Sequence, residues 1–113
     1  MKSKLLRLKD NAWKTFSKWI RERDGHCVTC GAGAENAGHF WHNMLDFDEI
    51  NINAQCVHCN KWMSGNLAVY AIYLIKKHGL RKFLDLYDRH NLEKGKTHKY
   101  DEAYYQAIIL KYK

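Results

Sequence analysis

Two cysteine pairs constrain this chain more than any other feature of its sequence. Cys27 and Cys30 form one pair, Cys56 and Cys59 form the other, and the sequence contains no further cysteine. Each Cys-x2-Cys turn can present both of its sulfurs to one point, so two such turns supply the four thiolates of a tetrahedral zinc site. The spacing therefore predicts that residues 27–30 and 56–59 meet in space around a zinc ion.

Two other uses of the cysteines are open. They could form two disulfide bonds, but disulfides are disfavoured in the cytosol, where we expect this chain. They could include a redox pair, but a redox Cys-x2-Cys turn has little need of a second pair. A zinc ion held by four cysteines has no free coordination position, so we expect a structural ion that stabilises a small domain of 113 residues.

The charge of the chain favours a polyanionic partner. Nineteen basic residues and twelve acidic ones give a net charge of +7, which favours nucleic acid as that partner. The longest apolar run, residues 67–75, is too short to cross a bilayer. Lys9 and Asp10 interrupt the apolar stretch that a secretory signal would need. We therefore expect a cytosolic protein with no membrane partner.

Apolar periodicity predicts several amphipathic helices. Residues 4–24 carry apolar side chains at three- and four-residue steps, and residues 66–78 and 80–90 do the same. Gly25 and Gly79 follow two of these segments directly, where glycine commonly ends a helix. A last helix should begin after Asp101, whose side chain is a favourable N-cap.

The segment between the first two helices is irregular and holds the polar motifs. Residues 26–40 contain several glycines and predict turns with short strands, and residues 47–56 alternate imperfectly, like a strand. A further helix should begin between residues 56 and 60. The expected fold class is α+β and mainly helical, with a single domain over residues 1–113. Its parts are an N-terminal helix at 4–24, a zinc-bearing core at 25–66 and C-terminal helices at 67–113.

Three polar residues are ordered around the cysteine pairs. His39 lies between the pairs, Asn51 precedes Cys56, and Asn60 directly follows Cys59. A neutral imidazole can take a proton from water, and an amide oxygen is a hard ligand that suits Mg²⁺ or Mn²⁺. Each residue also has an ordinary structural interpretation, because a histidine near glycines usually lies in a surface turn and asparagine often caps a turn or a helix.

These motifs resemble the NinG/Rap recombination nucleases of phages, which belong to the HNH (ββα-metal) superfamily. The order of the cysteine pairs, His39, Asn51 and Asn60 is that of the HNH nucleases, and an asparagine in the third position is similar to phage endonuclease VII. The resemblance covers roughly residues 13–80. The stretches that carry it are Trp19-Ile20-Arg21, Cys27-Val28-Thr29-Cys30-Gly31, Ala37-Gly38-His39-Phe40, Gln55-Cys56-Val57-His58-Cys59-Asn60 and Ser64-Gly65-Asn66-Leu67.

The resemblance implies a metal-dependent DNA endonuclease with a zinc-stapled ββα-metal core and flanking helices. It assigns His39 as general base, Asn51 as the residue that orients the imidazole by a hydrogen bond, and Asn60 as the ligand of a catalytic Mg²⁺ or Mn²⁺. Gly38 stands where many HNH enzymes carry a metal-binding Asp or His. The stretch from Asn36 to His39 is similar to the Asp-Arg-Gly-His signature of non-specific ββα-metal nucleases, which implies that Asn36 contacts waters of that metal. Weaker candidate ligands are His42, Asp46 and Asp48.

The resemblance also implies a substrate and a setting. The substrate would be branched DNA such as a Holliday junction, cut during phage recombination in the host cell cytosol, and symmetric cutting would favour a homodimer. Lys14, Lys18 and Arg21 are spaced to share one side of the first helix and suit phosphate contact, whereas Trp13 is interpreted as a core residue. Two alternatives are a general or nicking HNH endonuclease on duplex DNA and a catalytically inactive zinc module that only binds DNA.

Overall fold

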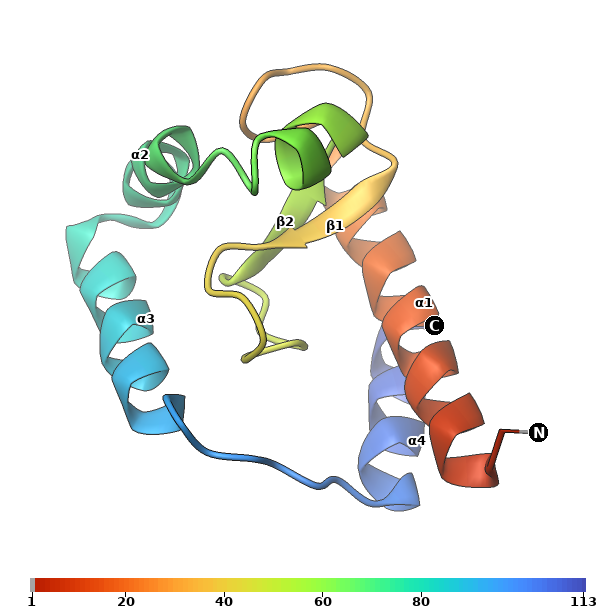
Figure 1. Ribbon diagram of the computed structural model, residues 1–113. Helices are drawn as coiled ribbons and strands as arrows, with labels where there is room; N and C mark the ends of the chain where they lie inside the picture. The colour runs from red at the N-terminus through yellow and green to blue at the C-terminus, as the bar shows by residue number, and fades with distance from the viewer. Residues whose placement is uncertain (1) are drawn as a thin grey trace.

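A short antiparallel β-hairpin lies at the centre of the structure, a computed structural model that describes residues 2–113 (Figure 1). Its strands are β1 (Asn36–His39) and β2 (Ile52–Gln55), paired with His39 opposite Ile52. Four helices and one shorter helical turn surround this hairpin. The predicted fold class, α+β and mainly helical, is confirmed.

Helices α1 (Lys4–Asp24) and α4 (Glu102–Tyr112) pack side by side on one face of the hairpin (Figure 1). The rings of Phe16 and Tyr112 meet edge-on, with their centroids 4.7 Å apart. Because strand side chains alternate between two faces, the hairpin contributes its small and aliphatic residues to this cluster. The buried members are Phe16, Ile20, Ala37, Ile52, Ala54 and Tyr112.

The ends of α1 lie where the sequence predicts them. The Ser3 hydroxyl accepts a hydrogen bond from the backbone amide of Leu6, which satisfies one of the free donors of the first turn. Gly25 follows the last turn in the left-handed conformation, with φ of 75°, and its amide donates to the carbonyl of Arg21. Both signals are local in sequence, so the bounds 4–24 could be predicted without the rest of the fold.

A buried carboxylate paired with a partly exposed arginine anchors the end of α1 to β2. The side chain of Asp24 is 2% exposed, and one of its oxygens lies 2.8 Å from Arg23 Nε. Its other oxygen accepts a hydrogen bond from the backbone amide of Ala54 at 2.8 Å. The Arg23 guanidinium also donates to the carbonyl of Ile52 and to Asn53 Oδ1. These contacts satisfy the charges that burial would otherwise make costly.

The other face of the hairpin is covered by a π-helical turn, η1 (His58–Trp62), and by α2 (Leu67–His78), which packs on α3 (Leu80–Glu93) (Figure 1). Tyr70 and Leu74 of α2 are fully buried and belong to a second apolar cluster with Phe40 and Leu86. The predicted helices at 66–78 and 80–90 are therefore confirmed, with the second extending to residue 93. Among residues 2–113, no helix is both long enough and apolar enough to cross a membrane.

The predicted strand at 47–56 is too long, because only its last part pairs with β1. Asp48 Oδ1 accepts hydrogen bonds from the backbone amides of Ile50 and Asn51, both at 2.9 Å. This local turn consumes the amides that a longer strand would need. The helix predicted to begin between residues 56 and 60 is the five-residue turn η1.

The hydroxyl of Tyr70 joins both strands of the hairpin to α2. It donates to the carbonyl of Gly38 at 2.7 Å, lies 3.2 Å from the carbonyl of Asn51, and accepts from Asn53 Nδ2 at 3.0 Å. Burial raises the pKa of this phenol, so the hydroxyl keeps its proton and remains a donor. Tyr73, on the same helix, forms no side-chain hydrogen bond within residues 2–113.

We predict that Tyr70→Phe lowers the free energy of unfolding by about 1–3 kcal/mol, because it leaves a buried carbonyl and a buried amide without their partner. Tyr73→Phe should cost about 0.5 kcal/mol or less, the usual effect of a change that breaks no such bond. Urea denaturation followed by circular dichroism measures both values. Equal losses in the two variants would contradict the role of the Tyr70 hydroxyl.

Candidate metal centre and active-site cleft

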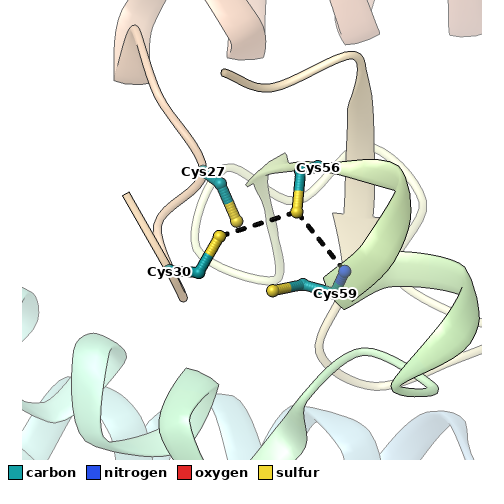
Figure 2. A group of neighbouring side chains, drawn as sticks. All are labelled: Cys27, Cys30, Cys56 and Cys59. Carbon is teal, nitrogen blue, oxygen red and sulfur yellow. Dashed lines mark hydrogen bonds between the residues drawn. The ribbon is translucent and has the colours of Figure 1, made fainter. Parts of the chain in front are cut away.

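The four cysteines converge on one point, as their spacing predicts (Figure 2). Cys27 and Cys30 lie in the loop after α1, Cys56 directly follows β2, and Cys59 lies in η1. All four Sγ atoms lie within 4.8 Å of one another, and all four thiols are free. In a tetrahedral zinc site the sulfurs would be separated by about 3.8 Å, given Zn–S bonds of about 2.3 Å. The donor set and its spacing are therefore consistent with a structural zinc ion.

Hydrogen-bond donors surround the sulfurs. The Thr29 hydroxyl lies 3.2 Å from Cys27 Sγ, the backbone amide of Cys59 donates to Cys56 Sγ at 3.4 Å, and Asn66 Nδ2 donates to Cys59 Sγ at 3.8 Å. Such donors stabilise thiolates and orient metal ligands. A disulfide would leave the sulfurs uncharged, with less use for these donors.

The pKa values of the two thiols in the first Cys-x2-Cys turn are shifted in opposite directions. Burial alone would raise the pKa of Cys27, but hydrogen bonds from the Thr29 side chain and from backbone amides outweigh it and lower this pKa to about 6. The Ala32 amide favours ionisation of Cys30, yet the sulfurs of Cys27 and Cys56 outweigh it and raise this pKa to about 12. Four thiolates this close together would repel one another, and a cation such as zinc would compensate their charge.

His39 ends β1 and is held from two sides. Its ring stacks on Trp13 of α1, with centroids 5.4 Å apart and planes inclined by 21°. Its Nε2 lies 2.9 Å from Asp46 Oδ1, in the loop between the strands. The hydrogen bond to His39 holds the pKa of the Asp46 carboxyl below its ordinary value, so Asp46 is charged near neutral pH. The imidazole is 24% exposed, so it remains accessible.

Asn51 does not contact the imidazole in the way the resemblance implies, and this expectation is corrected. Its side chain is fully buried, and its Oδ1 accepts from the backbone amide of Trp41 at 2.8 Å. Its Nδ2 donates to the carbonyl of Trp41 at 3.1 Å and lies within 3.4 Å of the carbonyls of Met44 and Leu45. The amide therefore braces the loop that carries Asp46, and it acts on His39 only through that loop.

His39 and Asn60 line the same cleft, which has a volume of about 680 Å³. His39 belongs to β1 and Asn60 belongs to η1. The four-cysteine cluster, which includes Cys59 of η1, lies at the junction of η1 and the hairpin. The residues that line the cleft are Lys9, Asp10, Trp13, His39, His42, Asn43, Asp46, Phe47 and Asn60. Two side chains that could assist catalysis, an imidazole and an amide, thus meet in one open space.

The structure places two of the four remaining candidate residues at the cleft. His42 and Asp46 line the cleft, whereas Asn36 does not. Asn36 begins β1, two residues before Gly38, and its expected contact with waters of a metal at Asn60 stays a prediction. Asp48 is removed from consideration, because its carboxylate is bonded to the local turn and to Arg89 at 2.8 Å.

Sequence reasoning missed the role of Trp13. Its interpretation as a core residue is half correct, because the ring contacts Phe16 but also stacks on His39 and lines the cleft. The sequence suggests Asp46 only as a weak metal ligand, whereas the structure pairs it with the imidazole. A carboxylate seven residues after a histidine carries no specific signal until the loop between the strands closes.

We predict that the purified chain binds one equivalent of zinc, and that Cys59→Ser loses both the zinc and cooperative unfolding. Apparent binding free energies of structural zinc, about 10–16 kcal/mol in small peptides, exceed or match the whole stability of a typical domain. Elemental analysis and thermal denaturation followed by circular dichroism test this. Returning zinc to chelator-treated wild type should restore the transition, and a metal-free chain with an unchanged melting temperature would contradict the prediction.

Comparison with known proteins gives a consistent family. The chain matches the family described as bacteriophage lambda NinG protein over residues 2–113. It is 34% identical over 110 residues to protein ninG of Escherichia phage 933W and to protein ninG of Salmonella phage P22, covering 89% of this chain and 52% of each relative. It is 36% identical over 89 residues to protein ninG of Escherichia phage lambda, covering 71% of this chain and 44% of that relative.

These matches cover a larger share of this chain than of its relatives. The chain spans about half the length of the curated relatives it matches. No solved structure matches it. The family match nevertheless includes α1, the four cysteines, the cleft and α4, which are the elements described above. This chain belongs to the bacteriophage lambda NinG family.

Proposed function

We propose that this chain is a metal-dependent DNA endonuclease that hydrolyses phosphodiester bonds, and that its substrate is branched DNA such as a Holliday junction, cut during phage recombination. The observation that carries the proposal is the shared cleft of His39 and Asn60. It brings a candidate base and a candidate cation ligand together, beside a cluster that can hold a structural zinc.

The contacts of His39 suit a general base. Its Nε2 faces the Asp46 carboxylate at 2.9 Å, so the tautomer that carries a proton on Nε2 is favoured. Nδ1 then keeps its lone pair and can take a proton from an attacking water. Stacking on Trp13 limits rotation of the ring, which keeps Nδ1 in one orientation. The pairing of histidine with a carboxylate also stabilises the charged imidazole formed by the transfer.

Asn60 is the side chain best suited to bind a catalytic cation. Its amide oxygen is a hard ligand, and the cleft has room for the waters that Mg²⁺ retains. His42, with its ring nitrogens, and Asp46 line the same cleft and could contribute to holding it. A divalent cation supplies charge stabilisation for the phosphate and for the leaving oxygen.

Basic side chains in the cleft and on the exposed side of α1 suit DNA. Lys9 lines the cleft itself, and Lys14 and Lys18 are exposed on the same helix. At 100° per residue, Lys14, Lys18 and Arg21 fall within about 60° of one another around α1. The ammonium group of Lys18 already has an acidic neighbour, since its Nζ lies 3.9 Å from Glu22 Oε1. This face and the net charge of +7 support phosphate contacts that do not read sequence.

Cleavage assays on a labelled four-way junction and a matched linear duplex test the proposal. Reactions contain Mg²⁺, Mn²⁺ or EDTA, with wild type, His39→Ala and the control His58→Ala, whose residue is exposed and lies outside the cleft. We expect junction cutting that requires the cation, falls by at least about 100-fold in His39→Ala, and is unchanged in His58→Ala. Symmetric resolution needs two active sites, so we also expect two chains per junction, measured by native mass spectrometry.

Other outcomes of the same assay select other functions. Equal cutting of both DNAs would support the proposed hydrolysis but not the preference for junctions, and would indicate a general or nicking endonuclease that acts on duplex DNA. Binding without cutting under any cation would refute the nuclease and leave a zinc module that only binds DNA.

We predict that Asp46→Asn lowers kcat by about 10–100-fold with little change in KM, because the imidazole loses the carboxylate that orients it and stabilises its charge. Asp85→Asn, on the exposed surface of α3, should leave both values unchanged. Steady-state cleavage kinetics measure the two constants. A change in KM alone would instead assign Asp46 to substrate binding.

A further inference from the structure

Gln55 is a buried amide whose orientation is determined by its neighbours. It ends β2, and its side chain is fully buried. Its Nε2 donates to the carbonyl of Gly65 at 2.8 Å and to the Thr29 hydroxyl at 3.2 Å. Because a backbone carbonyl can only accept, the nitrogen must face Gly65. The oxygen of the amide must therefore point the other way, toward β1.

That oxygen has no donor. Gln55 Oε1 is closed off from solvent and forms no hydrogen bond within residues 2–113, an arrangement that native structures rarely tolerate. It points at Gly38, where a Cβ atom would lie 2.0 Å from Gln55 Oε1 and 2.8 Å from Asn60 Oδ1. Two acceptor oxygens therefore approach the same point, and no proton lies between them.

The Asn60 amide can supply the missing proton. Its two ends differ little in size, and the torsion that exchanges them is soft. We infer that Gln55 is a positioning residue: its Oε1 accepts a hydrogen bond from Asn60 Nδ2, which turns Asn60 Oδ1 away from Gln55 and toward the cleft. The inference rests on the proposed function for the role of that oxygen, which is to bind the catalytic cation.

This arrangement also explains the glycine before His39. Any side chain at position 38 would occupy the space in which the two amides meet. The absence of a carboxylate at Gly38 then reflects clearance for Gln55 and Asn60, and the cation ligand is supplied from η1 instead of β1. The neighbouring His39 side chain is unaffected, because successive side chains of β1 point to opposite faces.

A cation bound directly between Gln55 Oε1 and Asn60 Oδ1 is the competing interpretation. An aspartate at position 60 separates the two. It has no N–H to offer Gln55, so under our inference its carboxylate is repelled from the buried oxygen and loses its orientation. If both oxygens bind the cation, the added negative charge should strengthen binding instead.

The first test uses the zinc-loaded chain without DNA or a second metal. Nuclear magnetic resonance on labelled protein should show a nuclear Overhauser effect between an Asn60 side-chain amide proton and a Gly38 Hα. The same amide protons should exchange with solvent at least tenfold more slowly than those of Asn43, an exposed amide that lines the same cleft. Absence of that effect, together with equally fast exchange at both amides, would overturn the inference.

The second test measures Mn²⁺ binding to the zinc-loaded chain by isothermal titration calorimetry. We expect at least tenfold weaker binding in Asn60→Asp, and unchanged or tighter binding in the control Asn43→Asp, which adds the same charge away from Gln55. Gln55→Leu should also weaken binding at least tenfold while retaining zinc, and if this variant fails to fold, Asn60→Asp decides alone. Binding by Asn60→Asp that equals or exceeds wild type would overturn the inference.

These measurements fail separately from the proposed function. Neither measurement involves DNA. If the chain is inactive but shows the Asn60 signal and the expected Mn²⁺ affinities, the role of Gln55 is supported and the nuclease activity is refuted. If the chain cuts DNA but lacks the Asn60 signal, the nuclease activity is supported and the role of Gln55 is refuted.

Discussion

The convergence of the four cysteine sulfurs is the contact on which the candidate site depends. One pair lies in the loop that leaves α1, and the other joins the end of β2 to η1. Without a common centre, η1 would be tied to the hairpin only by the chain and a few hydrogen bonds. Since Asn60 directly follows the last cysteine, the same centre determines how near this amide lies to β1. A structural cation at this centre would thus be coupled to the cleft without being one of its lining groups.

Buried amides form a second layer of organisation around the hairpin. Asn51, Asn53 and Gln55 are all buried, and each would be costly without partners. Asn51 braces the loop of residues 41–45, and Asn53 bonds to Arg23 and Tyr70. Because an amide bonds well only in a narrow range of geometry, these residues make the loop and strand positions more specific than apolar packing alone would.

His39 shows how these layers combine. The strand directs its ring toward α1, where Trp13 stacks on it, and the braced loop brings Asp46 to its Nε2. Each contact comes from a different element, so the orientation of one imidazole depends on α1, β1 and the loop between the strands together. These contacts bury one side of the cleft, while its other wall, with His42 and Asn43, is exposed.

Features that depend on near neighbours in the chain follow from the amino-acid sequence alone. The helices could be predicted because their apolar repeats, caps and terminal glycines act within a few residues, and the cysteine pairs because each turn presents two sulfurs together. The roles proposed for His39 and Asn60 rest on the resemblance and on the cleft that both residues line. Other features appear only in the folded structure: Asn51 bonds to a loop, Trp13 and Asp46 flank the imidazole, Asn36 lies outside the cleft, and the amides of Gln55 and Asn60 both approach Gly38. Those outcomes depend on which face of a strand meets which helix and on where a loop closes, and such contacts between distant residues leave no periodic or local signal in the chain.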